Sequence, residues 1–201
     1  LAVSLWSWSS PLAVGARSVE DQLHRLTASG VDIPCGMKNP TSGDFTVMLN
    51  AINASQKPQR FLYREWEIET KGNPFTHAIL RGYQDEDGRN MPNYHYETLI
   101  QIARLYNEEH FKNPAIIVDC NHCNSNKNCF EEPRIAKEVL HSIKVNPEIR
   151  SIVKGLMIES YLVDGNQSVD GGVYGKSITD ACLGWEKTEK LLLEIADELR
   201  K

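Results

Sequence analysis

The sequence predicts an α/β protein built around a parallel sheet, and three observations lead to this fold class. Short runs of β-branched and apolar residues alternate with segments of helical periodicity, which is the pattern of repeated βαβ units. Charged residues directly follow several of the apolar runs. The chain has 201 residues, 41% hydrophobic and 24% charged, which is typical of an ordinary globular protein. We therefore expect one domain over residues 1–201.

The first half of the chain is expected to begin with a helix over Val19–Ser29. Ser18 and Asp21 are its expected capping pair, and Gly30 is its expected end. The next elements are the strand Ile33–Met37, a helix from about Asp44 to Ala54, the exposed hairpin Phe61–Thr70 and the turn Lys71-Gly72-Asn73-Pro74.

The second half repeats the alternation of strands and helices without an internal repeat or linker. A long Gly-rich loop leads into the last helix. The expected elements are the strand His77–Leu80, the helix Tyr96–Glu109, the strand Ala115–Val118, the helix Arg134–Val145, the strand Leu156–Ile158 and the helix Glu186–Arg200.

The composition argues against several classes of protein. The net charge of −5 disfavours nucleic-acid binding, which needs a clustered basic face. No apolar segment approaches the length of a membrane span. The stretch Leu1–Arg17 is apolar, but it lacks the basic leader and the clean apolar run of a signal peptide. The odd number of cysteines, five, favours reduced thiols in a cytoplasmic protein.

Charged and metal-ligating side chains follow four of the predicted strands. Lys38, Arg81 and Glu159 each end an apolar run, and Asp119 and His122 follow a fourth. In a parallel barrel the carboxyl ends of the strands meet at one mouth, where active sites form. One such residue is ordinary, but four successive strands predict a convergent site, against the simpler alternative of a solvated rim.

These residues fall into two chemical classes. Lys38, Arg81 and Arg17 could together bind phosphate and carboxylate groups, arginine through a bidentate fork and lysine as a point charge. A second set, His122, Glu159 and Asp180, has the ligand chemistry for a divalent cation of the Mn, Fe, Co or Zn kind. Their separation in sequence leaves open that His122 is only a hydrogen-bonded core residue.

Ordered motifs along the chain resemble those of the type I 3-deoxy-D-arabino-heptulosonate 7-phosphate (DAHP) synthases. Gly15-Ala16-Arg17-Ser18 is similar to the GAR(T/S) segment of that family, and the resemblance continues to the last helix. The other matching segments are Gly36-Met37-Lys38-Asn39 (GxKN), Ile79-Leu80-Arg81-Gly82 (ILRG), Asp119-Cys120-Asn121-His122-Cys123-Asn124-Ser125 (DxSHxNS), Met157-Ile158-Glu159-Ser160, Gly165-Asn166-Gln167-Ser168 and the run from Tyr174 to Cys182.

The resemblance implies a (β/α)8 TIM barrel and a transferase of the shikimate pathway, which leads to chorismate and the aromatic amino acids. The implied reaction is metal-assisted condensation of phosphoenolpyruvate with erythrose 4-phosphate, giving DAHP and phosphate. Matched positions assign phosphoenolpyruvate binding to Ala16, Arg17, Lys38 and Arg81, and metal binding to His122, Glu159 and Asp180; Lys38 and His122 are the expected catalytic residues. The resemblance also implies that full-length members form homo-oligomers.

Some family features do not occur in these 201 residues. The fourth metal ligand, a cysteine on the first barrel strand, and the Lys-Pro-Arg-Thr segment after the second are missing. We therefore expect a partial barrel of about the last five βα units, with little synthase activity when isolated. Pro11 falls where the family pattern requires a central strand. The alternatives are a 3-deoxy-octulosonate 8-phosphate synthase-type sibling, and a non-catalytic remnant that acts as a binding or regulatory subunit.

Overall fold

The computed structural model describes residues 11–200, so most of the stretch considered above as a leader lies outside the described residues. The described chain forms a five-stranded sheet in the order β1-β2-β5-β8-β9, and its neighbouring strands all pair in parallel. The strands are β1 (Leu12–Val14), β2 (Cys35–Lys38), β5 (Thr76–Leu80), β8 (Ile116–Asp119) and β9 (Val153–Met157). The predicted α/β fold with a parallel sheet is confirmed.

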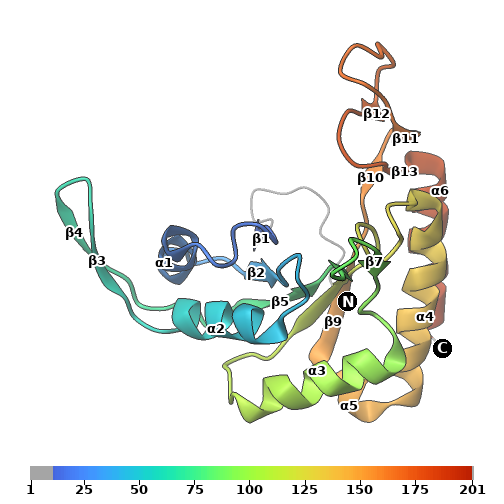
Figure 1. Ribbon diagram of the computed structural model, residues 1–201. Coiled ribbons are helices and arrows are strands. Elements are labelled where there is room, and N and C mark those ends of the chain that lie inside the picture. Colours follow the sequence, from blue (N-terminus) through green and yellow to red (C-terminus); the bar gives the residue numbers. More distant parts are fainter. Residues whose placement is uncertain (1–10, 201) are drawn as a thin grey trace.

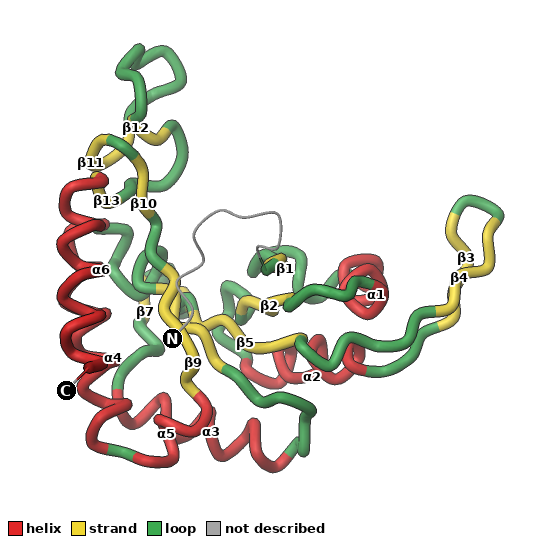
Figure 2. Tube along the Cα trace, turned by 180° about the vertical axis from the view of Figure 1, so that it is seen from behind, coloured by secondary structure: helices red, strands yellow, loops and turns green. Residues whose placement is uncertain are grey.

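Helices follow the strands of this sheet and cover one of its sides. In Figure 1, α2, α3 and α5 lie below the sheet, and α4 and α6 stand side by side at its end; Figure 2 shows the same arrangement from behind. The helices are α1 (Gln22–Gly30), α2 (Phe45–Gln56), α3 (Tyr96–Glu108), α4 (Glu132–Val145), α5 (Pro147–Ile152) and α6 (Trp185–Arg200).

The hydrophobic core lies between the sheet and these helices. Met37, Leu80 and Val118 on the strands belong to one buried cluster with helix residues such as Met48 and Ile102. Because side chains alternate along a strand, the residues next to these strand positions face the other side of the sheet. That second side carries the polar side chains at the strand ends.

The first helix is shorter than expected. It begins at Gln22, and Asp21 caps it by accepting a hydrogen bond from the Leu23 backbone N–H at 2.7 Å. The predicted start at Val19 and the capping role of Ser18 are wrong, because the Ser18 N–H donates to the Gly15 carbonyl in a preceding turn. Gly30 is the last helical residue and does not lie beyond the helix end.

Pro11 does not interrupt the sheet ladder. It lies immediately before β1, whose first residue, Leu12, donates its N–H to the Pro34 carbonyl at 2.9 Å. Within residues 11–200, β1 pairs with β2 alone and is therefore an edge strand. Proline is tolerated at the start of such a strand.

The predicted hairpin is confirmed as β3 (Arg60–Tyr63) and β4 (Trp66–Glu69), and it projects from the body of the molecule (Figure 1). Several short elements were not predicted. These are α5, the 3₁₀ turn Cys129–Glu131, β6 (Tyr83–Gln84), β7 (Asn90–Met91), β10 (Ser160–Tyr161), β11 (Val163–Asn166), β12 (Lys176–Ser177) and β13 (Leu183–Gly184).

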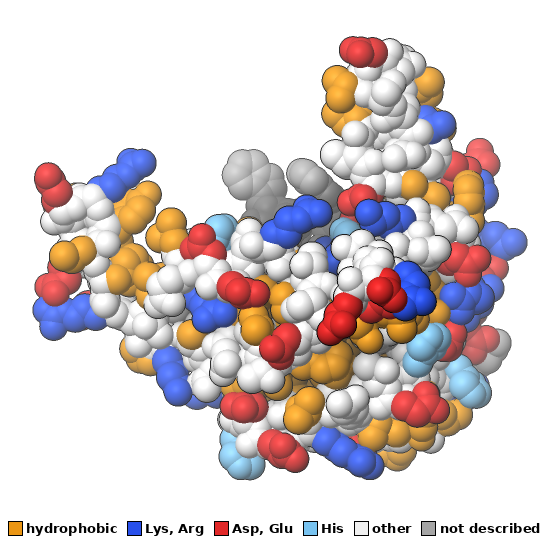
Figure 3. Space-filling view, in the orientation of Figure 1, with side chains coloured by type: hydrophobic (Ala, Val, Ile, Leu, Met, Phe, Trp, Pro, Cys, Tyr) orange, Lys and Arg blue, Asp and Glu red, His pale blue; other side chains and the backbone are white. Residues whose placement is uncertain are grey.

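The strands β10 to β13 form a second projection, at the top of Figure 1. Exposed apolar side chains occur on both projections, including Leu62 and Trp66 on the hairpin and Tyr174 between β11 and β12 (Figure 3). Among residues 11–200, every helix falls short of the length or apolarity that crossing a membrane requires.

Candidate active site

The carboxyl ends of β2, β5 and β8 bring predicted site residues to one edge of the sheet. Lys38 is level with Ile79, and Ile79 is level with Ile117, so the ends of these strands meet at similar heights. Lys38 and Asp119 face away from the helix-covered side. The Lys38 ammonium lies 2.9 Å from Asp119 Oδ2, so an ion pair joins the ends of β2 and β8, the two strands on either side of β5.

Asp119 connects the cationic side of this edge to the imidazole that follows β8. Its side chain is fully buried, and its Oδ2 atom lies 2.9 Å from both Lys38 Nζ and His122 Nδ1. Burial raises the pKa of Asp119, but the contacts with His122 and Lys38 outweigh burial and leave the pKa below its ordinary value. Sequence reasoning placed Asp119 at a strand end without assigning it this bridging position.

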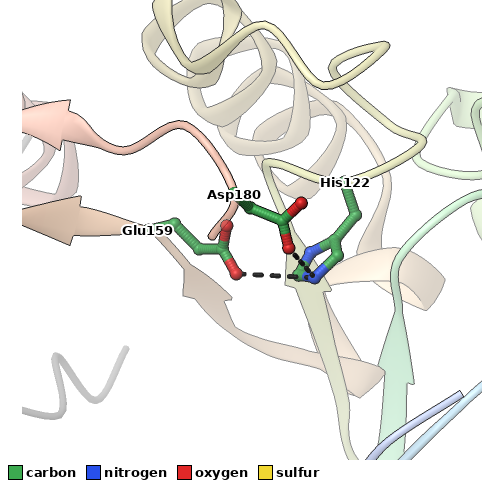
Figure 4. Close-up of side chains that lie close together, drawn as sticks. All are labelled: His122, Glu159 and Asp180. Carbon is green, nitrogen blue, oxygen red and sulfur yellow. Dashed lines mark ion pairs between the residues drawn. The ribbon is translucent and has the colours of Figure 1, made fainter. Parts of the chain in front are cut away.

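His122, Glu159 and Asp180 converge in space, as Figure 4 shows. His122 Nε2 lies 3.4 Å from Glu159 Oε1 and 3.8 Å from Asp180 Oδ2. One donor atom from each of the three residues lies within 4.8 Å of the others. An imidazole and two carboxylates at this separation suit a divalent cation. The residues come from three segments: the turn after β8, the short connection between β9 and β10, and the bend between β12 and β13.

The backbone at His122 has a conformation that directs its ring into this cluster. Its φ of +50° is in the left-handed region, which is uncommon for a residue other than glycine. The following residues form turns up to Lys127, whose N–H donates to the His122 carbonyl at 2.7 Å. With Nδ1 facing Asp119, the opposite nitrogen is the one presented to Glu159 and Asp180. A carboxylate behind a histidine is a common support for a metal ligand.

Burial raises the pKa of Glu159; nearby His122 opposes this shift, whereas Asp119 and Asp180 add to it. Two polar groups hold Glu159. The Asn121 side-chain amide donates to Glu159 Oε2 at 2.6 Å, and the Glu159 backbone N–H donates to Glu132 at 2.9 Å. Asp180 is about half exposed, so the cluster opens to solvent on that side.

Glu132, at the start of α4, is a buried carboxyl group that sequence reasoning missed. Its Oε2 accepts from the Glu159 backbone, and its Oε1 has no hydrogen-bond partner among residues 11–200. Burial, reinforced by Glu159 and Asp119, raises its pKa to about 9 even though that hydrogen bond opposes the shift. A glutamate in the first turn of a helix usually signals a favourable interaction with the helix dipole, so the sequence offered no sign of this role.

Buried asparagines link the strand ends. The Asn39 amide oxygen accepts from the Arg81 N–H at 2.9 Å and from the Asn93 side chain at 3.1 Å. Asn93 accepts from the Gly82 N–H at 2.8 Å. Asn124 donates to the carbonyls that end β5 and β8, at 3.1 and 2.7 Å. These amides therefore satisfy backbone groups beyond the last rungs of the sheet.

The remaining predicted anion-binding residues lie at the same end of the sheet. Arg81 follows β5, and its side chain is only 9% exposed, although its guanidinium makes no ion pair with any residue from 11 to 200. Ala16 and Arg17 follow β1; Ala16 is half-buried and Arg17 is exposed. Within residues 11–200, Lys38 is therefore joined to the carboxylate cluster through Asp119, whereas the two arginines make no ion pair.

Comparison with known proteins connects this arrangement to a family. The model of the DAHP synthetase I family matches residues 5–193. The Tyr-sensitive phospho-2-dehydro-3-deoxyheptonate aldolase of Escherichia coli is 40% identical over 97% of this chain, which covers 54% of that protein. The corresponding protein of Enterobacter agglomerans is 40% identical, over 98% of this chain and 90% of its own sequence.

A solved structure agrees with these sequence matches. The phospho-2-dehydro-3-deoxyheptonate aldolase of Francisella tularensis SCHU S4 superimposes with a TM-score of 0.83 and 34% identity, covering 94% of this chain and 55% of that one. The chain thus spans about half the length of the Escherichia coli and Francisella proteins. Together with the strand-end motifs, these matches establish that the chain belongs to the DAHP synthetase I family.

Proposed function

We propose that this chain carries the metal-binding and phosphoenolpyruvate-binding part of a DAHP synthase (3-deoxy-7-phosphoheptulonate synthase). In this proposal, residues 1–201 form one domain, a partial (β/α)8 barrel comprising about the last five βα units. Five parallel strands, the helices on one side of their sheet and the family membership support it. The observation that carries the proposal is that Lys38, Asp119 and His122 form one continuous chain of contacts from the anion-binding side to the metal-ligating side.

Phosphoenolpyruvate would lie over the cationic side of this edge. Arg81 supports this assignment, because a nearly buried guanidinium that has no carboxylate partner in the described part of the chain favours an anionic ligand. Lys38 supplies a second positive charge, and its ammonium group is already held by Asp119. Arg17 and the Ala16 backbone would complete the binding of phosphoenolpyruvate from the end of β1.

A divalent cation of the Mn, Fe, Co or Zn kind would be held by His122, Glu159 and Asp180. The donor set fits such an ion, since it combines one imidazole nitrogen with two carboxylates whose atoms converge within 4.8 Å. When bound, the ion supplies Lewis-acid polarisation of the aldehyde oxygen of erythrose 4-phosphate. Asp119 keeps the imidazole in one orientation, and the buried strand ends limit the movement of Glu159.

In the proposed reaction, the methylene carbon of phosphoenolpyruvate forms a bond to the aldehyde carbon of erythrose 4-phosphate. Water adds to the neighbouring carbon of the former enol phosphate, and inorganic phosphate leaves, giving DAHP. Lys38 and His122 are the proposed catalytic residues. The Lys38 ammonium, paired with Asp119, would offset the negative charge of phosphoenolpyruvate and carry a proton beside the reacting carbons.

Binding and turnover test this proposal separately. Calorimetric titration of the purified chain with phosphoenolpyruvate, in the presence of Mn²⁺, should detect binding that Arg81→Ala weakens at least about tenfold. Arg104→Ala, an exposed arginine on α3, is the matched control and should bind normally. Equal affinity of the Arg81→Ala variant would contradict the proposed anion site.

Turnover is then measured as phosphoenolpyruvate consumed and phosphate released with erythrose 4-phosphate. Arabinose 5-phosphate in a parallel assay distinguishes the sibling reaction. Phosphoenolpyruvate binding without turnover would support a part that binds substrate but needs further residues for condensation. Turnover near that of a full-length relative would instead overturn the expectation of little activity in the isolated chain.

The proposal also covers the localisation of the protein and its partners. Cytoplasmic localisation is supported by the five cysteines, all of which are free thiols, four of them buried. The proposed partners are phosphoenolpyruvate and erythrose 4-phosphate, with neither nucleic acid nor membrane, and a homo-oligomer is proposed for full-length members of the family. Interspersed cationic and anionic side chains on the face shown in Figure 3 agree with small-molecule rather than polyanion binding.

A further inference from the structure

Asn121 lies at the point where the three segments that carry His122, Glu159 and Asp180 meet. It directly precedes His122 in the turn after β8, and its side chain is 1% exposed. Asn121 is not one of the three proposed metal ligands, and neither the strand-end pattern nor the family motif identified it as a site residue. Its hydrogen bonds nevertheless reach all three segments.

Each polar atom of the Asn121 side chain has a partner. Its Nδ2 donates to Glu159 Oε2 at 2.6 Å and to the Ala181 carbonyl at 2.8 Å. Its Oδ1 accepts from Ser125 Oγ at 2.7 Å. Ala181 directly follows Asp180 in the chain, so one amide group holds a ligand carboxylate and the backbone beside a second ligand.

The bond to Glu159 selects which carboxylate oxygen faces the other ligands. Oε2 is held by Asn121, which leaves Oε1 directed toward His122 Nε2 at 3.4 Å. Without the amide, rotation about the last side-chain bond of Glu159 would exchange the two oxygens or turn both away. The Ser125 contact at the amide oxygen prevents Asn121 from flipping and presenting an acceptor to the carboxylate.

Serine, which the family pattern has at this position, could not make the same pair of bonds. A hydroxyl group has one donor hydrogen, whereas the amide has two and here uses both. A hydroxyl is also carried directly on Cβ and reaches less far across the site. The arrangement is therefore a feature of this chain's own sequence.

We propose that Asn121 is a positioning residue that pre-orients Glu159 and the segment of Asp180 for a divalent cation. This inference rests on the metal site in the proposed function. Partners that orient metal ligands typically change metal affinity about 10- to 100-fold when they are removed. Asn121→Ser should therefore raise the Kd for Mn²⁺ within that range.

The test is calorimetric titration of the purified, chelator-treated chain with Mn²⁺ alone, together with thermal unfolding of the metal-free protein. Asn107→Ser, an exposed position on α3, is the matched control and should keep the wild-type Kd. Co²⁺ absorption spectra of wild type and Asn121→Ser add a readout of coordination geometry, which a purely structural role would leave unchanged. The expected result is a weaker Kd and an altered Co²⁺ spectrum.

An unchanged Kd and spectrum in Asn121→Ser would overturn the assignment, whatever happens to its thermal stability. If Asn121→Ser does not fold, Ser125→Ala takes its place; it removes the 2.7 Å bond that orients the amide, together with the longer 3.4 Å contact to the His122 carbonyl, and should raise the Kd about twofold to tenfold. An unchanged Kd in that variant would then refute the role. A wild-type chain that binds no Mn²⁺ would refute the metal site and this inference together, while phosphoenolpyruvate titration would still report on the anion site.

Discussion

Replacing the buried Glu132 by glutamine should stabilise the protein at neutral pH. Burial raises the pKa of this carboxyl group from 4.5 to about 9, so it is protonated in the folded protein at pH 7 and ionised in the unfolded chain. Folding at pH 7 must therefore take up a proton. The stability that the group contributes is fully present below pH 4.5 and is lost progressively as the pH rises toward 9.

The size of the effect follows from this pKa difference. Each pH unit above the unfolded pKa costs about 1.4 kcal/mol, which gives about 3 kcal/mol at pH 7. Glutamine has the same shape and can accept the Glu159 N–H through its amide oxygen, but it does not titrate. Its NH2 group would occupy the buried Oε1 position, which has no hydrogen-bond partner among residues 11–200; this leaves one more unsatisfied donor than the protonated carboxyl group has and offsets about 1 kcal/mol of the gain.

Urea unfolding of the wild type and Glu132→Gln, followed by circular dichroism with excess chelator, tests this reasoning. The variant should be more stable by about 2 kcal/mol at pH 7, and its advantage should grow by about 1.4 kcal/mol per unit between pH 5 and 8. Glu189→Gln, on an exposed position of α6, should change the unfolding free energy little. A difference that does not vary with pH, or a variant less stable throughout, would refute the assignment of a neutral carboxyl.

Three further outcomes are expected. Asp119→Asn leaves Lys38 and His122 without their shared carboxylate and should lower the free energy of unfolding, measured in urea, by about 2–4 kcal/mol. The control Glu194→Gln, in an exposed ion pair, should lower it by less than about 1 kcal/mol. Equal losses in the two variants would contradict the buried bridge. Gly82→Ala should cost at least about 2 kcal/mol, because φ is +72° and the new Cβ would lie 2.7 Å from the Asn124 nitrogen, whereas Gly88→Ala, with a similar φ and open space, should cost about 1–2 kcal/mol. Mn²⁺ at 100 times its Kd should stabilise the wild type by about 2.7 kcal/mol, and His122→Ala should abolish that gain while its metal-free fold persists; a gain of equal size in the variant would place the ion elsewhere.

The sequence allowed the main elements and the strand-end residues to be predicted, because both depend on local periodicity. The hairpin at Phe61–Thr70 and the strands β2, β5 and β8 were expected close to their observed positions, whereas β9 begins at Val153, before the expected start at Leu156. The strands β10 to β13 were not, because they are two to four residues long and are defined by pairing with distant partners. Helix α5 had a local signal in Asn146 followed by Pro147, which together cap and begin it, but the signal was overlooked.

For the candidate site too, the sequence predicts what depends on local pattern and misses what depends on contacts between distant residues. Which residues follow which strands can be read from sequence, so Lys38, Arg81 and His122 were found. The contacts that a side chain makes after folding cannot be read from the sequence. Asp119, Asn121 and Glu132 are held by hydrogen bonds to residues that lie 27 to 81 positions away along the chain. The strand-end pattern located Asp119 but not its partners; an asparagine in a turn and a glutamate at a helix start are ordinary, so nothing local distinguished Asn121 or Glu132.

The buried amides explain how an edge of the sheet can be both open and well defined. Backbone groups beyond the last rungs of parallel strands lose their ladder partners, and exposure to water would let those ends move. Asn39, Asn93 and Asn124 replace the missing rungs with side-chain bonds at 2.7 to 3.1 Å, and each is almost fully buried. An asparagine can donate and accept at once, so it can join two strand ends without adding charge beside Asp119. The backbone on either side of the charged residues at this edge is therefore held in place by neutral groups, and Arg81 itself makes no ion pair with any of residues 11–200.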